Sequence, residues 1–183
     1  VGAAKYGQTA LVTVTGTHLD TGLAVASAGC KNPTLSTTAP NASSATTAYY
    51  TCTVSGVGAQ TLAVNRTVDP TTLFTANFTV PVPQVTMTVS NAPGTVAGSM
   101  VITLAPDKSP ITVDNFLQYV NTGYYAGTIF HRVVSGFVAQ GGGFLPVTTL
   151  PAVAKAGLSP PITLEVPNGL SNVQWSIAMA RTN

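Results

Sequence analysis

Residues 130–144, with the sequence FHRVVSGFVAQGGGF, contain the side chains of this chain that are best suited to binding chemistry. Arg132 carries a guanidinium, which offers a rigid fork of hydrogen-bond donors and stays charged at any working pH. Such a group can hold a carbonyl oxygen in a preorganised electrostatic site. The glycines after Gln140 do not indicate a phosphate-binding loop, because neither a Lys-Ser/Thr pair nor a helix signal follows them.

Other kinds of chemistry find no support in the sequence. His18 and His131 lie far apart, and no group of Cys and His has the spacing of a zinc site. No G-x-S-x-G sequence is present, so Ser–His–Asp hydrolysis is not indicated. The carboxylates are dispersed and form no obvious acid–base pair: Asp20, Asp69, Asp107, Asp114 and Glu165. We therefore expect neither a metal site nor a cofactor.

A helix and two strands are predicted around this segment. The strands are expected over 128–134 and 137–140, on either side of a turn. Ser109 is a good helix N-cap, and Pro110 suits the first helical position, where its missing N–H has no cost. Gly123 indicates the C-terminal stop of the helix. An apolar stripe with the spacing i, i+3, i+4 and i+7 faces a core: Val113, Phe116, Leu117 and Val120.

The first 83 residues are predicted to form an immunoglobulin-like β-sandwich. Apolar and polar residues alternate along its strands, which places one face on a core and the other in water. Residues 81–84, Pro-Val-Pro-Gln, indicate a stiff junction, so a second domain is expected over 84–183 and the chain is expected to be mainly β. The strands before the helix are expected over 10–15, 50–54, 62–68, 74–80, 85–89 and 100–104.

The composition narrows the range of partners. Of the 183 residues, 45% are hydrophobic, enough for a packed core, and 7% are charged. The net charge of +2 is too small to indicate a nucleic-acid partner. No stretch of 18 uncharged apolar residues is present, so no membrane span is expected. A surface so poor in charge leaves self-association open.

The two cysteines, Cys30 and Cys52, favour one disulfide in an oxidising compartment. Their separation is shorter than the inter-sheet bridge of antibody domains, so the disulfide is expected to join neighbouring strands or a loop. Two buried thiols are the alternative.

The segment 130–144 resembles the signature of the cyclophilins, in which FHR, two apolar residues and a turn precede F-x-x-QGG-x-F. Residues 108–125 are similar to the first helix of that family and its exit. Residues 161–165, 168–172 and 176–182 resemble its bacterial branch, so the likeness covers about 84–183. It implies a β-barrel with helices over its ends and catalysis of rotation about X–Pro bonds. That rotation has a barrier of about 20 kcal/mol and is slow unaided.

The resemblance implies roles for five residues. Arg132 matches the catalytic arginine, against the alternative of an ordinary surface arginine. Phe137 matches the floor of the proline pocket, and simple core packing is its alternative. Gln140 matches the residue that binds the substrate backbone and orients the arginine. Val138 stands where the family often has Met and keeps that position apolar but shorter. Ala180 matches a backbone position that pairs with the substrate, or else belongs to a barrel strand without ligand contact.

Other aromatic and histidine residues are expected to have structural roles. His131 belongs to the motif and is expected to be a packed or hydrogen-bonded core histidine. Tyr124, Tyr125 and Trp175 are expected to pack rather than to stack on a ligand. For Trp175, alone in a loop before a strand, partial exposure is the alternative. The first 80 residues show no family resemblance that can be named.

Asn183 falls inside the domain that the resemblance implies, before the residues that would supply the rest of the pocket and the last strands. We therefore expect the sequence to belong to a longer chain. Completion of the fold by another copy or another polypeptide, and an inactive truncated form, are the alternatives.

The leading hypothesis is a secreted, periplasmic or cell-surface bacterial foldase that acts on proline-containing polypeptides. One alternative is a cell-surface or filament-forming protein with a degenerate cyclophilin scaffold, motivated by the charge-poor surface and an open barrel edge. Another is a peptide-binding chaperone module in which the first domain engages clients.

Overall fold

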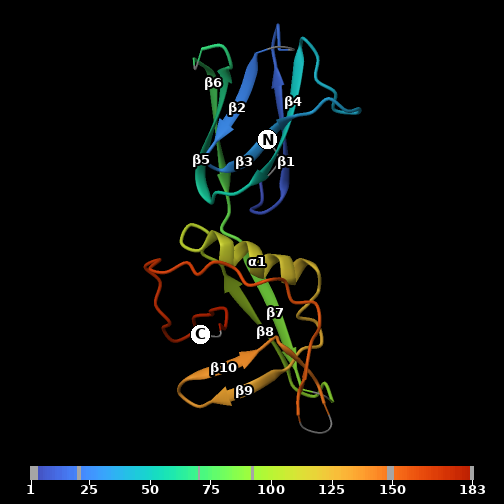
Figure 1. Ribbon diagram of the computed structural model, residues 1–183, viewed down its shortest axis with the longest axis vertical. Helices are drawn as coiled ribbons and strands as arrows, with labels where there is room; N and C mark the ends of the chain where they lie inside the picture. The colour runs from blue at the N-terminus through green and yellow to red at the C-terminus, as the bar shows by residue number, and fades with distance from the viewer. Residues whose placement is uncertain (1–3, 20–21, 70, 92, 148–150, 182–183) are drawn as a thin grey trace. The chain divides into compact units, whose positions relative to one another are not determined.

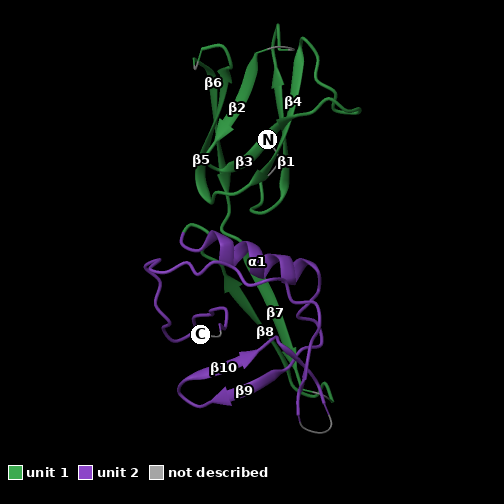
Figure 2. Cartoon of the chain, viewed as in Figure 1, with its two compact units in different colours: residues 1–107 green, residues 108–183 purple. Residues whose placement is uncertain are grey.

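The computed structural model describes residues 4–19, 22–69, 71–91, 93–147 and 151–181. Within these residues the chain forms twelve strands and one helix, so it is mainly β, as predicted (Figure 1). The chain divides into two compact units, residues 1–107 and 108–183 (Figure 2). Residues 84–107 lie in the first unit, and the domain boundary expected after residue 83 stays a prediction.

Two three-stranded antiparallel sheets form the first part of unit 1, in the orders β1-β4-β3 and β2-β5-β6. Their strands are β1 (Thr9–Thr15), β2 (Leu23–Ser27), β3 (Cys30–Leu35), β4 (Thr47–Val54), β5 (Gly58–Arg66) and β6 (Thr72–Val80). The alternation predicted all of β1, β4, β5 and β6. The predicted strand 62–68 ran too far, since β5 ends at Arg66 and Val68 is exposed, and Phe74 in β6 is exposed as well.

The core between these sheets draws on both of them. In β4, Tyr50 is buried with only 4% of its surface exposed, and it packs with residues of the other sheet, including Val25 and Val64. Its hydroxyl donates a hydrogen bond of 3.1 Å to the carbonyl of Leu23 in β2, and burial raises its pKa. The sheets therefore pack face to face as a sandwich. Its immunoglobulin-like character stays a prediction.

Strands β2 and β3 are not among the predicted strands. In β3 the pairing with β4 shifts register between Lys31 and Thr34, and Asn32 has a φ of 53°. Because β3 is an edge strand, a proline without an N–H is tolerated at this irregularity.

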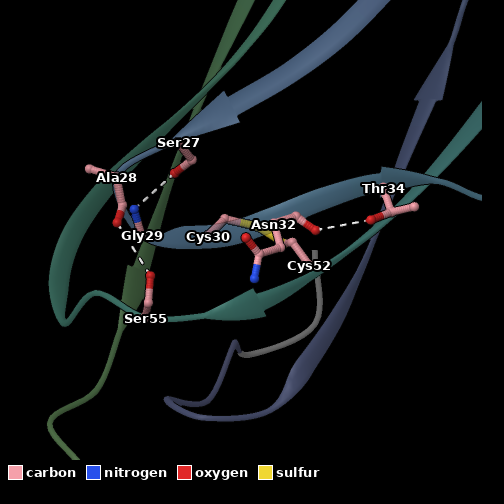
Figure 3. Close-up of a disulfide and its surroundings, with 8 residues drawn as sticks. All are labelled: Ser27, Ala28, Gly29, Cys30, Asn32, Thr34, Cys52 and Ser55. Atoms are coloured by element: carbon pink, nitrogen blue, oxygen red, sulfur yellow. Dashed lines mark hydrogen bonds between the residues drawn. A yellow bond between two sulfur atoms is a disulfide. The ribbon is translucent and has the colours of Figure 1, made fainter. Parts of the chain in front are cut away.

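The disulfide between Cys30 and Cys52 joins β3 to its neighbour β4, which confirms both the bridge and the expectation that it joins neighbouring strands (Figure 3). The Cα atoms are 5.6 Å apart, and both residues are buried. The turn before Cys30 is held by hydrogen bonds from Gly29 N–H to Ser27 Oγ and from Ser55 Oγ to the Ala28 carbonyl. Such a bridge is typical of an oxidising environment.

Unit 1 also contains the antiparallel hairpin of β7 (Gln84–Ser90) and β8 (Ala97–Thr103). Asn91 closes it, since its N–H donates to the carbonyl of Val96 and its Oδ1 accepts the Val96 N–H, each at 2.9 Å. Both strands were predicted.

Helix α1 (Pro110–Asn121) opens unit 2 with Pro110 at its first position, as predicted. Ser109 occupies the N-cap position, but its side chain caps no N–H, so the predicted capping is wrong in this respect. At the other end, Gly123 has a φ of 70°, and the N–H groups of Gly123 and Tyr124 bond the carbonyls of Val120 and Tyr119. This is a Schellman motif, which confirms the stop.

The rest of unit 2 holds β9 (Phe130–Val134), β10 (Val138–Gly141), β11 (Phe144–Leu145) and β12 (Val153–Ala154). They pair as two separate two-stranded sheets, and the described strands do not close into a barrel. No helix among the described residues is long and apolar enough to cross a membrane.

Candidate functional site

The candidate site lies on the antiparallel hairpin β9–β10. Residues 135–137 form its turn, in which the Phe137 N–H bonds the Val134 carbonyl at 3.1 Å. Gly136 has a φ of 70°, a conformation that favours glycine. The short turn therefore fixes which residues of the two strands stand opposite each other.

The register places Arg132 directly opposite Gln140, and Val134 opposite Val138. Because side chains alternate along a strand, these four residues project from one face of the hairpin. The Arg132 guanidinium carbon lies 5.6 Å from the ring centroid of Phe137, within cation–π range. Arg132, Phe137, Val138 and Gln140 are thus brought together on one hairpin.

Two glycines follow Gln140 at positions where a Cβ would meet neighbouring atoms. Between Gln140 and Gly141 the pairing with β9 shifts, so Gly141 stands opposite Phe130. A Cβ at Gly141 would lie 3.0 Å from the Ile129 carbonyl oxygen and 2.9 Å from Cδ1 of Phe130. A Cβ at Gly142, whose φ is 91°, would lie 3.0 Å from the Tyr125 ring. The glycine run thus permits close packing immediately after Gln140.

The predicted floor of the pocket is open to solvent in this structure. Phe137 has 76% of its surface exposed, so the alternative of simple core packing is not what its surroundings show. Arg132 is also exposed, and Val138 and Gln140 are half-buried. An exposed ring beside an exposed guanidinium can receive an apolar ring and a carbonyl at adjacent points.

Ala180 lies in the C-terminal segment, outside the β9–β10 hairpin. It is exposed and lies outside any strand. Trp175 has 94% of its surface exposed, so the expectation that it packs is wrong. The ring of His131 packs on that of Phe144, with centroids 4.5 Å apart, but His131 is exposed rather than part of a core.

An aromatic cluster beside the hairpin confirms the packing role of the two adjacent tyrosines. Tyr124 lies 4.8 Å from Tyr119 and 5.6 Å from Tyr125, measured between ring centroids. Burial, and secondarily the neighbouring Tyr119 and Tyr124, raises the pKa of Tyr125 to about 12. Lys155 closes the cluster, because its ammonium lies 5.3 Å from the Tyr124 ring and donates to the Ala126 carbonyl at 2.7 Å.

Glu165 is the residue whose role the sequence analysis missed. The sequence shows it as one of several dispersed carboxylates, but its carboxylate binds the start of α1. The sequence feature that could have pointed to this role is the first turn of α1, which contains no acidic residue of its own.

Residues 84–183 match the sequence model of the cyclophilin type peptidyl-prolyl cis-trans isomerases. The chain belongs to this family. The match includes the whole β9–β10 hairpin and begins where the sequence indicated the second domain.

Curated relatives support the same assignment. The chain is 45% identical to peptidyl-prolyl cis-trans isomerase A of Dickeya dadantii over 89 residues. These residues make up 49% of this chain and 44% of the relative. Over 89 residues it is 48% identical to the isomerase cyp18 of Streptomyces antibioticus, covering 49% and 51%. Over 85 residues it is 47% identical to isomerase B of Escherichia coli, covering 46% and 49%. The chain spans about half the length of these relatives. No solved structure matches it.

Proposed function

We propose that the full-length protein is a peptidyl-prolyl cis/trans isomerase in which Arg132 is the catalytic residue. The observation that carries this proposal is the register of the β9–β10 hairpin, which places Arg132 opposite Gln140 with its guanidinium beside the exposed ring of Phe137. Family membership of residues 84–183 supports the reaction type.

The chemistry needs hydrogen bonding and shape alone. Amide resonance is the barrier to rotation, and it weakens when the prolyl nitrogen becomes pyramidal. The Arg132 guanidinium can donate toward that nitrogen in the twisted state while it holds a neighbouring carbonyl. Gln140, directly across the ladder, is placed to bind the substrate backbone and to orient the guanidinium.

The apolar part of the site would hold the proline ring. Phe137 offers an exposed aromatic face, and Val138 continues the apolar surface from the next position in the chain. Ala180 is proposed to pair with the substrate backbone through its main chain. This role rests on the family resemblance.

We propose further that the substrates are exported proteins and that the protein works in the periplasm, at the cell surface or outside the cell. The Cys30–Cys52 disulfide supports an oxidising compartment. We also propose that the isomerase domain begins at residue 84 and follows an immunoglobulin-like sandwich, which is supported by the family match and by the two packed sheets of unit 1.

The test is catalysed isomerisation of a short Ala-Pro peptide by the full-length protein and its variants. Arg132→Ala is expected to lower kcat/KM by about 100-fold, the typical effect of removing a transition-state donor. Arg66→Ala is the matched control, since Arg66 is exposed, pairs with Asp69 at 3.9 Å and lies in the other unit. Retention of activity in Arg132→Ala would sink the assigned mechanism.

A further inference from the structure

Residues 159–168, called here the strap, run along α1 in the opposite direction to it and are bonded to it at three points (Figure 1). The Ser159 N–H donates to the Tyr119 hydroxyl at 2.7 Å, near the C-terminal end of the helix. At the other end, the Asn168 amide donates to Ser109 Oγ at 2.7 Å. The strap forms no helix or strand, so its position depends on such anchors.

The central anchor is the carboxylate of Glu165, which completes the first turn of α1. Its Oε1 accepts the Ile111 N–H at 3.0 Å, and its Oε2 accepts the N–H and the hydroxyl of Thr112 at 2.8 and 2.7 Å. Pro110 has no N–H, and the Val113 N–H bonds the Ser109 carbonyl at 3.0 Å. Every N–H of the first turn is therefore hydrogen-bonded. Glu165, 53 positions after Thr112 in the chain, takes the place of a local capping residue.

The electrostatics favour the ionised carboxylate at this position. Partial burial alone would raise the pKa of Glu165, but the hydrogen bonds from Ile111 and Thr112 outweigh it and lower the pKa below its ordinary 4.5. The charged side chains nearest the same end of the helix in the sequence are Lys108 and Asp114. The positive end of the helix dipole adds to the preference for a negative charge.

We propose that Glu165 is a positioning residue for substrate binding: by clamping the strap to α1, it sets the place of the following segment, residues 169–181. That segment carries Ala180, whose main chain is proposed to pair with the substrate. The inference rests on the proposed function, because it assigns Glu165 an effect on binding of the same X–Pro peptides.

The first experiment tests the hydrogen bonds between Glu165 and the start of α1 directly, without any activity measurement. In the full-length protein, the amide proton shifts of Ile111 and Thr112 are followed by NMR as the pH is lowered. In the wild type both are expected to titrate together with an apparent pKa below 4.5, and in Glu165→Gln this titration is expected to vanish. Asp114→Asn, which removes a carboxylate from the same helix, is expected to retain it. Persistence of the titration in Glu165→Gln would overturn the clamp.

The second experiment measures the dissociation constant of an Ala-Pro peptide, separately from its turnover. Glu165→Gln is expected to weaken binding about fivefold with kcat nearly unchanged, the effect of losing one helix cap. Thr112→Val, which removes only one of the three hydrogen bonds and keeps a β-branched side chain, is expected to weaken it about twofold. Unchanged binding in both variants would overturn the positioning role. A wild-type protein that binds peptide without turning it over would instead refute the proposed function.

Discussion

Removal of the Cys30–Cys52 disulfide is expected to take away a large share of the free energy of unfolding of unit 1. Comparison of the two single variants with the double variant tests whether loop closure is the cause. The bridge closes a loop with a sequence separation of 22 residues. Chain-entropy arithmetic for a loop of that length gives about 3 kcal/mol at 25 °C. Domains of this size have only about 5–15 kcal/mol in total.

Either single substitution destroys the whole cross-link. Cys30→Ala and Cys52→Ala are therefore each expected to lower the free energy of unfolding by about 3 kcal/mol, plus at most about 1 kcal/mol for the void in a buried site. The double variant loses the cross-link only once. The two single effects should thus add up to about 3 kcal/mol more than the double effect.

The measurement is urea denaturation followed by far-ultraviolet circular dichroism, with a reduced wild-type sample as the control. Trp175 is the one tryptophan of the chain and is 94% exposed in unit 2, so its fluorescence would report little of this transition. Additive single effects, or a reduced wild type as stable as the oxidised one, would refute the loop-closure reasoning.

Two further predictions concern unit 2. Gly141→Ala is expected to lower the free energy of unfolding by about 1–3 kcal/mol, because its Cβ would meet the Ile129 carbonyl at 3.0 Å, whereas Gly143→Ala, with nothing within 4 Å, should change it by less than about 0.5 kcal/mol. Equal effects in urea denaturation would contradict the close-packing account. Tyr125 is expected to ionise near pH 12 by ultraviolet titration, a step absent from Tyr125→Phe. Since its pKa is raised from 10.0, stability should fall as the pH rises from about 10 to 12, and ionisation at the ordinary pH would disprove the burial effect.

Local patterns predicted much of the fold. Alternation gave four of the six sandwich strands because one face of each lies on the shared core, as with the buried Tyr50 and Val64. The ends of α1 also follow local rules, with Pro110 at its first position and Gly123 in the left-handed conformation at its exit. The candidate site could also be predicted from local sequence, because a hairpin with a short turn keeps residues that are close in sequence close in space.

The parts that could not be predicted depend on distant partners. Strand β3 carries Asn32-Pro33, which indicates a turn unless the bonding of its edge to β4 is known. Ser109 has the residue type of a cap, but its hydroxyl instead accepts from Asn168, and capping falls to Glu165. No pattern in a single sequence pairs a helix start with a carboxylate so far along the chain.

The free-state contact between Arg132 and Phe137 bears on whether the hairpin can work as proposed. The guanidinium lies on the same ring that would receive the proline, so substrate must share or replace that contact. At an exposed site a cation–π contact is worth about 0.5–1 kcal/mol, and burial of a proline ring against Phe137 would recover a similar or larger amount. The exchange is therefore nearly free of cost. It would leave Arg132 next to the bound ring, on the side where a donor to the prolyl nitrogen is needed, with Gln140 across the ladder to hold it there.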